Sequence, residues 1–183
     1  MDIRFLSSNK HKIHEVKEIL EPIGVCIIPV EIKIDEIQTK DVRRLVRDKV
    51  LKAFECIGRP VFVEHTGLYL LGLNGFPGGL TQIFWDSLQA QSFVDLVKNL
   101  EDHRVEAKTV IGYCDASKIH YFEGNVNGTV PDTPIGSTDF QWDCVFKPDG
   151  FNQTFAELGK KKNDISMRRL ALDKFAAFIK ERE

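Results

Sequence analysis

This sequence of 183 residues lacks the features that define several large protein classes. Its four cysteines have no Cys-x-x-Cys pair and no histidine at zinc-ligand spacing, so we expect free thiols, mostly in the core, and no structural zinc site. No stretch approaches the roughly 18 consecutive apolar residues of a membrane-spanning helix. Internal repeats and low-complexity tracts are also missing.

The chain has little net charge, −2 at neutral pH, which gives no reason to expect general attraction to nucleic acid or to a membrane. Any anion that it binds must therefore meet a local group of basic residues. The first residues show no basic stretch followed by a long apolar run, so we expect a cytoplasmic protein.

What the sequence does contain is typical of a well-packed globular protein. Apolar residues make up 43% and charged residues 28% of the chain, and 13 phenylalanines are available for a core. A length of 183 residues suits one domain. We predict a single domain over residues 1–183, built as two lobes around a cleft.

One stretch, residues 61–68, is central to the prediction. It reads Val-Phe-Val-Glu64-His65-Thr66-Gly67-Leu68, and its apolar start predicts a buried strand that ends at the polar lip of a cleft. Glu64 is a candidate oxygen ligand for a hard cation, and His65 is a candidate base, acid or metal ligand. Taken alone, such a pair is more often solvated or hydrogen-bonded than catalytic.

Apolar periodicity predicts the elements of the rest of the chain. We expect strands over residues 3–6, 25–30, 108–114 and 119–125, and helices after Asn9 and over 40–56, 81–88 and 91–100. A last helix should present an apolar face that includes Ile165, Leu170, Leu172, Phe175 and Ile179. The strands at 108–114 and 119–125 should form a hairpin on the far side of the domain. The glycines and prolines from Gly124 to Gly136 predict a loop region.

The segment after the first strand is a candidate phosphate site. Ser7, Ser8 and Asn9 lead into Lys10-His11-Lys12 at the start of the predicted helix, where free backbone N–H groups favour an anion. Taken alone, this segment is better explained as an ordinary solvated basic turn. Lys49, in the helix over 40–56, faces either the cleft or water.

Together and in order, these motifs resemble those of the inosine triphosphate pyrophosphatase (Ham1-like) family. The matching segments are residues 7–12, 64–68, 75–78, 140–143, 154–158 and 162–168. The resemblance covers nearly the whole chain and implies an α/β fold, with a mixed β-sheet flanked by helices and a nucleotide cleft between two lobes. It also implies a homodimer and a magnesium-dependent reaction that converts a deaminated purine nucleoside triphosphate to its monophosphate and pyrophosphate.

The resemblance assigns roles to individual residues. The catalytic positions are Lys12, Glu64 and His65, and the metal positions are Glu36, Glu64 and His65, for Mg²⁺ or, because of the imidazole, Mn²⁺. The nucleotide-binding positions are Ser7, Ser8, Asn9, Lys12, Lys49, Thr66, Phe140, Trp142, Asp143, Lys162, Ser166 and Arg168.

Base recognition follows from three of these side chains. Phe140 and Trp142 offer faces on which a purine stacks, although either one taken singly would be assigned to the core. Arg168 carries only hydrogen-bond donors, so it suits a 6-keto oxygen and not the 6-amino group of adenine. Mispairing a buried donor costs about 1–3 kcal/mol, enough to prefer inosine-type over adenine-type bases.

Four positions depart from the family pattern. His65 replaces an aspartate that takes part in metal binding and water activation, Met167 replaces a histidine, and Gln141 and Ser8 replace glycines. Exchanging a carboxylate for imidazole removes a negative charge and a hard oxygen ligand, so magnesium-assisted hydrolysis should suffer while binding persists.

Our leading hypothesis from the sequence is therefore a protein that recognises dITP, ITP or XTP but hydrolyses it poorly or not at all. It would act as a nucleotide sensor or as the regulatory subunit of a protein effector. The alternative is an active pyrophosphatase in which His65 serves as base or favours manganese. A third possibility is a protein-interaction module that has kept the fold and lost the ligand.

Overall fold

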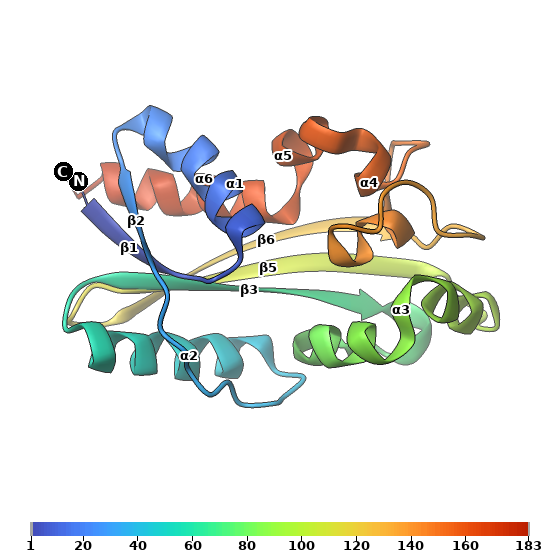
Figure 1. Ribbon diagram of the computed structural model, residues 1–183, viewed down its shortest axis with the longest axis horizontal. Coiled ribbons are helices and arrows are strands. Elements are labelled where there is room, and N and C mark those ends of the chain that lie inside the picture. The colour runs from blue at the N-terminus through green and yellow to red at the C-terminus, as the bar shows by residue number, and fades with distance from the viewer. Residues whose placement is uncertain (1, 183) are drawn as a thin grey trace.

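In the computed structural model, which describes residues 2–182, seven strands form one mixed sheet. Their order is β2-β1-β3-β5-β6-β7, with β4 paired to the end of β3. β1 (Asp2–Leu6) is parallel to β2 (Cys26–Val30) and β3 (Val61–Leu70), whereas β5 (Arg104–Cys114) and β6 (Ile119–Thr129) run antiparallel to their neighbours. The short strands are β4 (Phe76–Pro77) and β7 (Lys147–Pro148). The predicted α/β class with a mixed sheet is confirmed (Figure 1).

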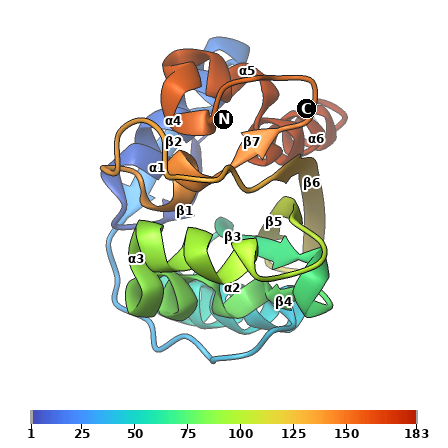
Figure 2. The same ribbon diagram turned by 90° about the vertical axis from the view of Figure 1, so that its right-hand side faces the viewer.

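Helices cover both faces of this sheet. α1 (Lys10–Leu20) and α6 (Met167–Lys180) lie on one face, and α2 (Val42–Ile57) lies on the other. At one end of the long strands, α3 (Thr81–Lys98) lies opposite the short helices α4 (Phe155–Leu158) and α5 (Lys162–Ile165) (Figures 1 and 2). No helix within residues 2–182 combines the length and apolarity needed to span a membrane.

Several helices, including α1, α2 and α6, begin at a polar side chain that caps them. Asn9 accepts a hydrogen bond from the backbone N–H of Lys12 at 3.1 Å, so α1 begins directly after it, where the sequence predicted a helix, and Asp41 and Ser166 cap α2 and α6 in the same way. Such caps satisfy N–H groups that have no partner inside the helix. They fix the first turns of α1 and α6, from which site residues project.

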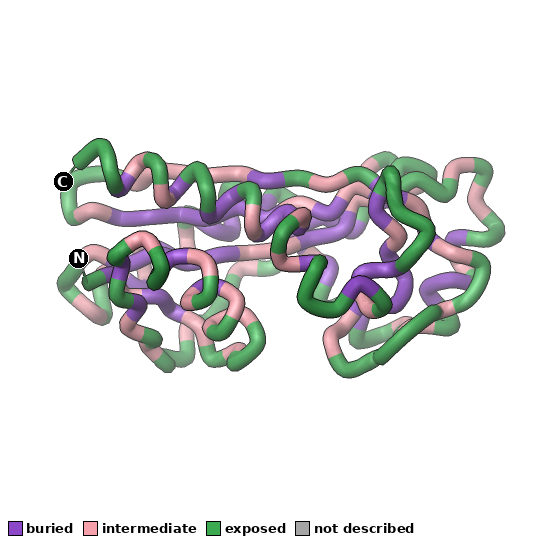
Figure 3. The backbone as a smooth tube through the Cα atoms, turned by 90° about the horizontal axis from the view of Figure 1, so that it is seen from above, coloured by how far each residue is buried: buried purple, intermediate pink, exposed green. Residues whose placement is uncertain are grey.

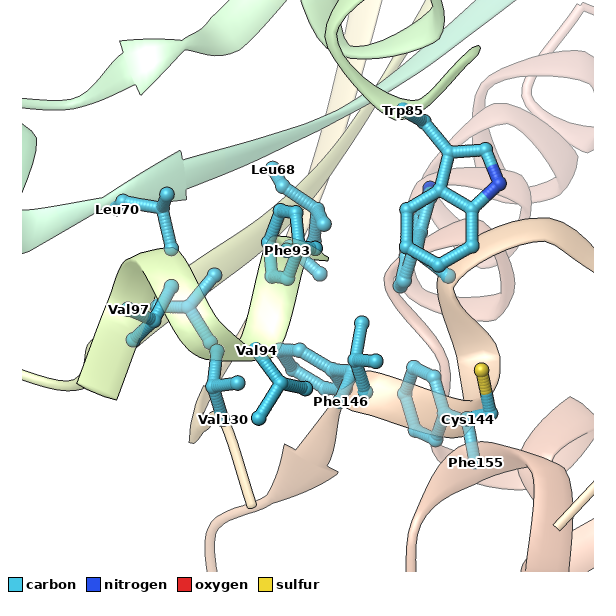
Figure 4. Packing of buried hydrophobic residues seen from close by; sticks show 14 of the residues in the cluster. Leu68, Leu70, Trp85, Phe93, Val94, Val97, Val130, Cys144, Phe146 and Phe155 are labelled. Carbon is cyan, nitrogen blue, oxygen red and sulfur yellow. The ribbon is translucent and has the colours of Figure 1, made fainter. Parts of the chain in front are cut away.

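The core consists of clusters on both faces and at one end of the sheet. The α1 and α6 face buries Phe5, Phe62 and Phe175, while the α2 face buries a set rich in valine. A further cluster lies under α3 and includes Trp85 and Phe93 (Figure 4). Buried residues follow the central strands and the inner sides of the helices, and exposed residues lie outside (Figure 3).

Several predicted details of the elements were wrong. β3 continues to Leu70, so Glu64 and His65 lie in the middle of a strand and not at its end. The hairpin is not on a far side of the domain, because β5 pairs directly with β3 and places Ile111 opposite Glu64. The side chain of Leu170 is exposed, whereas Met167 of the same helix is buried.

The predicted loop around Gly124 is part of β6, and the reason is close packing. A Cβ at Gly124 would lie 2.1 Å from the carbonyl oxygen of Met167 in α6, and a Cβ at Gly128 would lie 2.3 Å from that of Lys147 in β7. Here glycine allows close backbone approach and does not mark a turn. The four cysteines are free, as expected, but Cys26 and Cys56 are exposed, so the thiols are not mostly in the core.

Candidate functional site

The site forms where β3 loses one of its neighbours. β1 pairs with β3 only as far as Phe5 and Phe62, and β1 then turns into α1 through residues 7–9. Between Phe62 and the pairing of β4 with Tyr69 and Leu70, therefore, the side of β3 next to β1 has no strand neighbour among the described residues. Glu64, His65 and Thr66 occupy this open stretch, which gives a buried strand access to a ligand.

A cavity of about 200 Å³, here called the polar cavity, lies at this opening. It is lined by side chains from α1, α2, β3, α3, α6 and the loops between them: Lys12, Glu36, Lys49, Glu64, His65, Thr66, Thr81, Gln82, Trp85, Phe140, Gln141, Trp142, Met167 and Arg168. Segments far apart in the sequence thus meet around β3. Three of the lining side chains are cationic and two are carboxylates.

Glu64 is the most tightly held of these groups. Its Oε1 lies 2.9 Å from the Nζ of Lys12, and its two oxygens accept hydrogen bonds from the Nε of Arg168 at 2.7 Å and the Nη2 at 3.2 Å. Burial of Glu64, which is 4% exposed, opposes ionisation, but Arg168 and Lys12 outweigh it and hold its pKa far below the usual range. Glu64 is therefore a carboxylate at any physiological pH.

Arg168 connects the polar cavity to a second one. It is 1% exposed, and its Nη1 donates to Glu15 of α1 while its other donors face Glu64. Glu15 also lies 3.8 Å from the Nζ of Lys162, which forms an ion pair with Asp143 at 2.7 Å. Burial, partly offset by Lys162, raises the pKa of Asp143, whose Oδ1 has no partner within residues 2–182.

The second cavity, here called the outer cavity, measures about 310 Å³. Its lining comes from α1, the segment before β7, and α4 and α5: His11, His14, Glu15, Glu18, Ser137, Asp139, Phe140, Asp143, Phe155, Ala156, Gly159, Lys160, Lys162 and Asn163. The ring of Phe140 lines both cavities, and the Nζ of Lys162 lies 3.9 Å from its centroid. An extended ligand that reaches past Phe140 would contact both.

His65 differs from its charged neighbours. Its Nε2 is buried and has no hydrogen-bond partner among the described residues. Burial and the positive charges of Lys12 and Lys49 lower the pKa of His65 to about 4. The imidazole is therefore neutral at physiological pH.

Glu36 and Lys49 form a further ion pair, at 2.5 Å, on the α2 side of the polar cavity. Glu36 lies in the segment between β2 and α2, and Lys49 projects from α2. The sequence did not decide whether the Lys49 side chain faces the cleft or water, and in the structure it lines the polar cavity.

The donor set does not fit a magnesium ion as it is arranged. Magnesium takes oxygen ligands in a near-octahedral shell. Both oxygens of Glu64 face cationic donors, Glu36 faces Lys49, and position 65 offers nitrogen. Residues 2–182 contain no group of three or more His, Cys, Asp or Glu side chains placed to hold a metal ion.

Most predicted site residues meet at these cavities. The residues that line one or both are Lys12, Glu36, Lys49, Glu64, His65, Thr66, Phe140, Trp142, Asp143, Lys162 and Arg168. Ser7, Ser8, Asn9 and Ser166 line neither. Ser7 accepts from the Asn9 N–H at 3.2 Å, and Asn9 and Ser166 cap helices, so these side chains shape the backbone around the site.

Sequence reasoning missed Glu15 and Gln82. Glu15 lies three positions after Lys12, a spacing that places both on one side of α1 and that could have identified it. Gln82 had no such signal, because its partner Gln141 is 59 residues away in the chain. The Nε2 of Gln141 donates to the Oε1 of Gln82 at 2.5 Å, across one wall of the polar cavity.

The departure at Gln141 has a backbone consequence. Its φ is +43°, in the left-handed region that favours glycine. The side chain takes part in the contact with Gln82 that a glycine would lack. Met167, another departure from the family pattern, lines the polar cavity and is buried in the cluster with Trp85 and Trp142.

Comparison with known proteins gives a consistent result. A model of the Ham1 family matches residues 3–178. A "dITP/XTP pyrophosphatase" from Methanopyrus kandleri is 33% identical, with 98% of this chain and 97% of that protein covered. An "Inosine triphosphate pyrophosphatase" from Scheffersomyces stipitis is 34% identical, with 97% of each covered.

Solved structures agree on the fold. A HAM1 protein from Coxiella burnetii superposes with a TM-score of 0.85 at 22% identity and 99% coverage of both chains. The Ham1 protein of Staphylococcus aureus gives a TM-score of 0.81 at 23% identity and full coverage.

Proposed function

This chain belongs to the Ham1 family, and we propose that its two adjoining cavities bind a deaminated purine nucleoside triphosphate such as dITP, ITP or XTP. The supporting observation is the series of buried and half-buried ion pairs that runs from Lys12 through Glu64 and Arg168 to Glu15 and Lys162. It supplies cations in the polar cavity for phosphates and donors near Phe140 for a base.

We assign the phosphates to the polar cavity and the base to the outer cavity. Lys12 and Lys49 line the former, whereas Phe140, Lys162 and Asp143 meet at the latter. Lys162 and Arg168 carry donors only, which suits a 6-keto oxygen. Because three Arg168 donors already face Glu64 and Glu15, Lys162 is the better placed of the two to meet the base.

The proposed reaction is hydrolysis to the nucleoside monophosphate and pyrophosphate. The names of the relatives, which are pyrophosphatases of dITP, XTP or ITP, support this alternative better than the sensor hypothesis that the sequence favoured. In such a reaction Lys12, beside Glu64, would offset charge on the leaving phosphates.

The second candidate function is binding of the nucleotide with slow turnover, because His65 replaces the aspartate that takes part in water activation in the family. Losing a group that activates or positions water typically costs about 10²–10⁴-fold in rate, while the cations that bind phosphate remain. In this case a protein effector would respond to occupancy. A homodimer remains a proposal that follows from the family resemblance alone.

Two measurements separate the candidates. Binding of dITP is measured by calorimetry, and pyrophosphate release is followed in parallel with magnesium, manganese, cobalt and zinc. Turnover at rates ordinary for enzymes with any of these ions supports the pyrophosphatase and excludes the sensor. Binding without turnover supports the second candidate, and no binding under any condition contradicts both.

His65→Asp tests the origin of a low rate. Restoring the carboxylate should raise magnesium-dependent pyrophosphate release by about tenfold or more, because it returns a hard oxygen ligand and a base to the polar cavity. His65→Asn, which returns neither a charge nor a base, is the matched control. Equal rates for the two variants would show that position 65 does not limit turnover.

A further inference from the structure

The polar cavity differs from a typical magnesium-triphosphate site in its balance of charge. Lys12, Lys49 and Arg168 face two carboxylates, Glu36 and Glu64, and each carboxylate already lies within 3 Å of a cationic nitrogen. A bound cation needs carboxylate charge that is free to face it. Here that charge is already neutralised by the protein's own side chains.

Position 65 removes the remaining candidate anion. An imidazole is either neutral or positive, so His65 never contributes a negative charge to the cavity, whichever protonation state it adopts. Its Nε2 is enclosed within the protein and is not open to the cavity. The side chain thus lines the cavity without offering it a hard ligand.

The two lysines are placed to replace the cation. Lys12 projects from the first turn of α1 and Lys49 from α2, and both line the polar cavity together with His65 of β3. Both positive charges are close enough to His65 to lower its pKa. Glu36, the partner of Lys49, comes from the irregular segment between β2 and α2, and its side chain is partly exposed, so its carboxylate can exchange Lys49 for water when a phosphate binds. Glu64, in contrast, is fixed by Arg168.

We propose that the polar cavity binds the triphosphate without a bridging divalent cation, with Lys12 and Lys49 supplying the opposing charge. The inference rests on the proposed function, since it concerns the same nucleotide and the same cavity. It applies to binding alone. A nucleotide carrying a magnesium ion brings fewer negative charges to these side chains than the free nucleotide does.

The test is calorimetric binding of an inosine triphosphate analogue with a methylene group between the α and β phosphorus atoms, which blocks cleavage. Titrations with EDTA and with excess magnesium are compared for the same protein. The dissociation constant in EDTA should equal that in magnesium or be lower. An increase of more than about threefold in EDTA would overturn the proposal.

His65→Asp and His65→Asn make the test specific to this position. The aspartate should weaken binding in EDTA by about tenfold or more, with recovery in magnesium, because it places an unpaired anion beside the phosphates. The asparagine, which adds no charge, should bind alike in both buffers. Thermal unfolding of each variant confirms that it is folded, and manganese titrated alone, followed by electron paramagnetic resonance, should show saturable binding to the aspartate variant only.

The outcomes separate this inference from the proposed function. Binding in magnesium but not in EDTA overturns only the inference and leaves the nucleotide assignment intact. No binding of the analogue in either buffer overturns the proposed function and, with it, the inference. Equal magnesium dependence of the wild type and both variants would show that position 65 has no part in the effect.

Discussion

At the scale of single residues, Arg168 is the most constrained side chain of the site. It is almost fully buried and is paired with Glu64 on β3 and with Glu15 on α1. Burial opposes its charge, but the two carboxylates raise its pKa above the usual value. The ion pairs of Arg168 therefore connect α6, β3 and α1, so Arg168 has a structural role in addition to any contact with a ligand.

Arg168→Gln should lower the free energy of unfolding by about 3 kcal/mol, because it leaves buried carboxylates without their main partner. Urea denaturation measures the change. The control is Arg169→Gln, which removes a largely exposed pair with Asp173 and should cost less than about 0.5 kcal/mol. Equal losses for the two variants would contradict the structural role of Arg168.

His65 shows a different principle at the same scale. The sequence shows that position 65 carries an imidazole, but it does not show the protonation state of that imidazole. The low pKa of His65 depends on burial and on the lysines of α1 and α2. Likewise, Trp142 was predicted to stack on a base, and the structure shows it 4% exposed and in T-shaped contact with Phe146. Trp142 is therefore both part of the core and part of the cavity wall.

At the scale of elements, the packing of α6 on β6 positions the site. Gly124 allows the first turn of α6 to lie directly on the strand, with a Cβ position only 2.6 Å from the backbone nitrogen of Ala171. Because Arg168 lies in this first turn, the close approach of α6 to Gly124 determines how far the Arg168 side chain reaches toward Glu64 on β3.

Gly124→Ala should therefore destabilise the protein by about 1–3 kcal/mol or more, since the added methyl group meets backbone and not a flexible side chain. It should also weaken nucleotide binding, because α6 must shift. Asn125→Ala, at the exposed neighbouring position, is the control and should leave both quantities nearly unchanged. Unfolding and calorimetric binding are measured on both variants, and an unaffected Gly124→Ala protein would show that α6 has room to adjust.

The turn between β5 and β6 is the second element-scale feature. Asp115 accepts hydrogen bonds from the N–H groups of Ser117 and Lys118, and its Oδ2 lies 2.7 Å from the Nε2 of His120 and 2.8 Å from the Nη1 of Arg182. Partial burial opposes ionisation, but these donors outweigh it and lower the pKa of Asp115 well below its ordinary value. The carboxylate thereby ties the hairpin to the end of α6.

Asp115→Asn should cost about 1.5–3 kcal/mol at neutral pH, the range for hydrogen bonds to a charged group. Because the folded-state pKa is depressed, this stability is present above the unfolded pKa of about 4 and is lost as the pH falls below it. The difference between wild type and variant, measured by denaturation at several pH values, should therefore shrink in acid. A difference that grows as the pH falls would contradict the assignment.

At the scale of the whole molecule, the two cavities join segments from both ends of the chain. α1, near the start, and α5 and α6, near the end, meet over β3 through Glu15, Lys162 and Arg168. A ligand that spans both cavities would contact these segments together. Its binding should therefore stabilise the fold as a unit.

At 100 times its dissociation constant, the uncleavable inosine triphosphate analogue should add about 2.7 kcal/mol to the free energy of unfolding. For a chain of this size the unfolding temperature should rise by roughly 5–10 °C. The adenosine counterpart at the same concentration should give a clearly smaller shift, because its 6-amino group faces donors. A melting series measures both, and no shift with either analogue would favour the interaction module that has lost its ligand.

The sequence by itself determined the family and most of the residues that line the polar cavity, and the resemblance to that family implied the mixed sheet. The positions of the strands and helices follow from apolar periodicity and from capping side chains such as Asn9, whereas the family and its site residues follow from short motifs such as Glu64-His65-Thr66-Gly67 that keep their spacing. Such signals lie within one element or one turn, so no three-dimensional information is needed to read them.

Only the tertiary structure decided how these side chains are used. The structure shows that Glu64 lies in the middle of β3 and forms ion pairs with Lys12 and Arg168. It also shows that Glu15 and Gln82 belong to the site, and that the segment around Gly124, predicted as a loop, is part of β6. The physical reason is that burial, pairing of charges and close backbone approach depend on residues up to 153 positions apart. No pattern within a single element encodes such distances, so the charge balance of the polar cavity could be found only after the chain was folded.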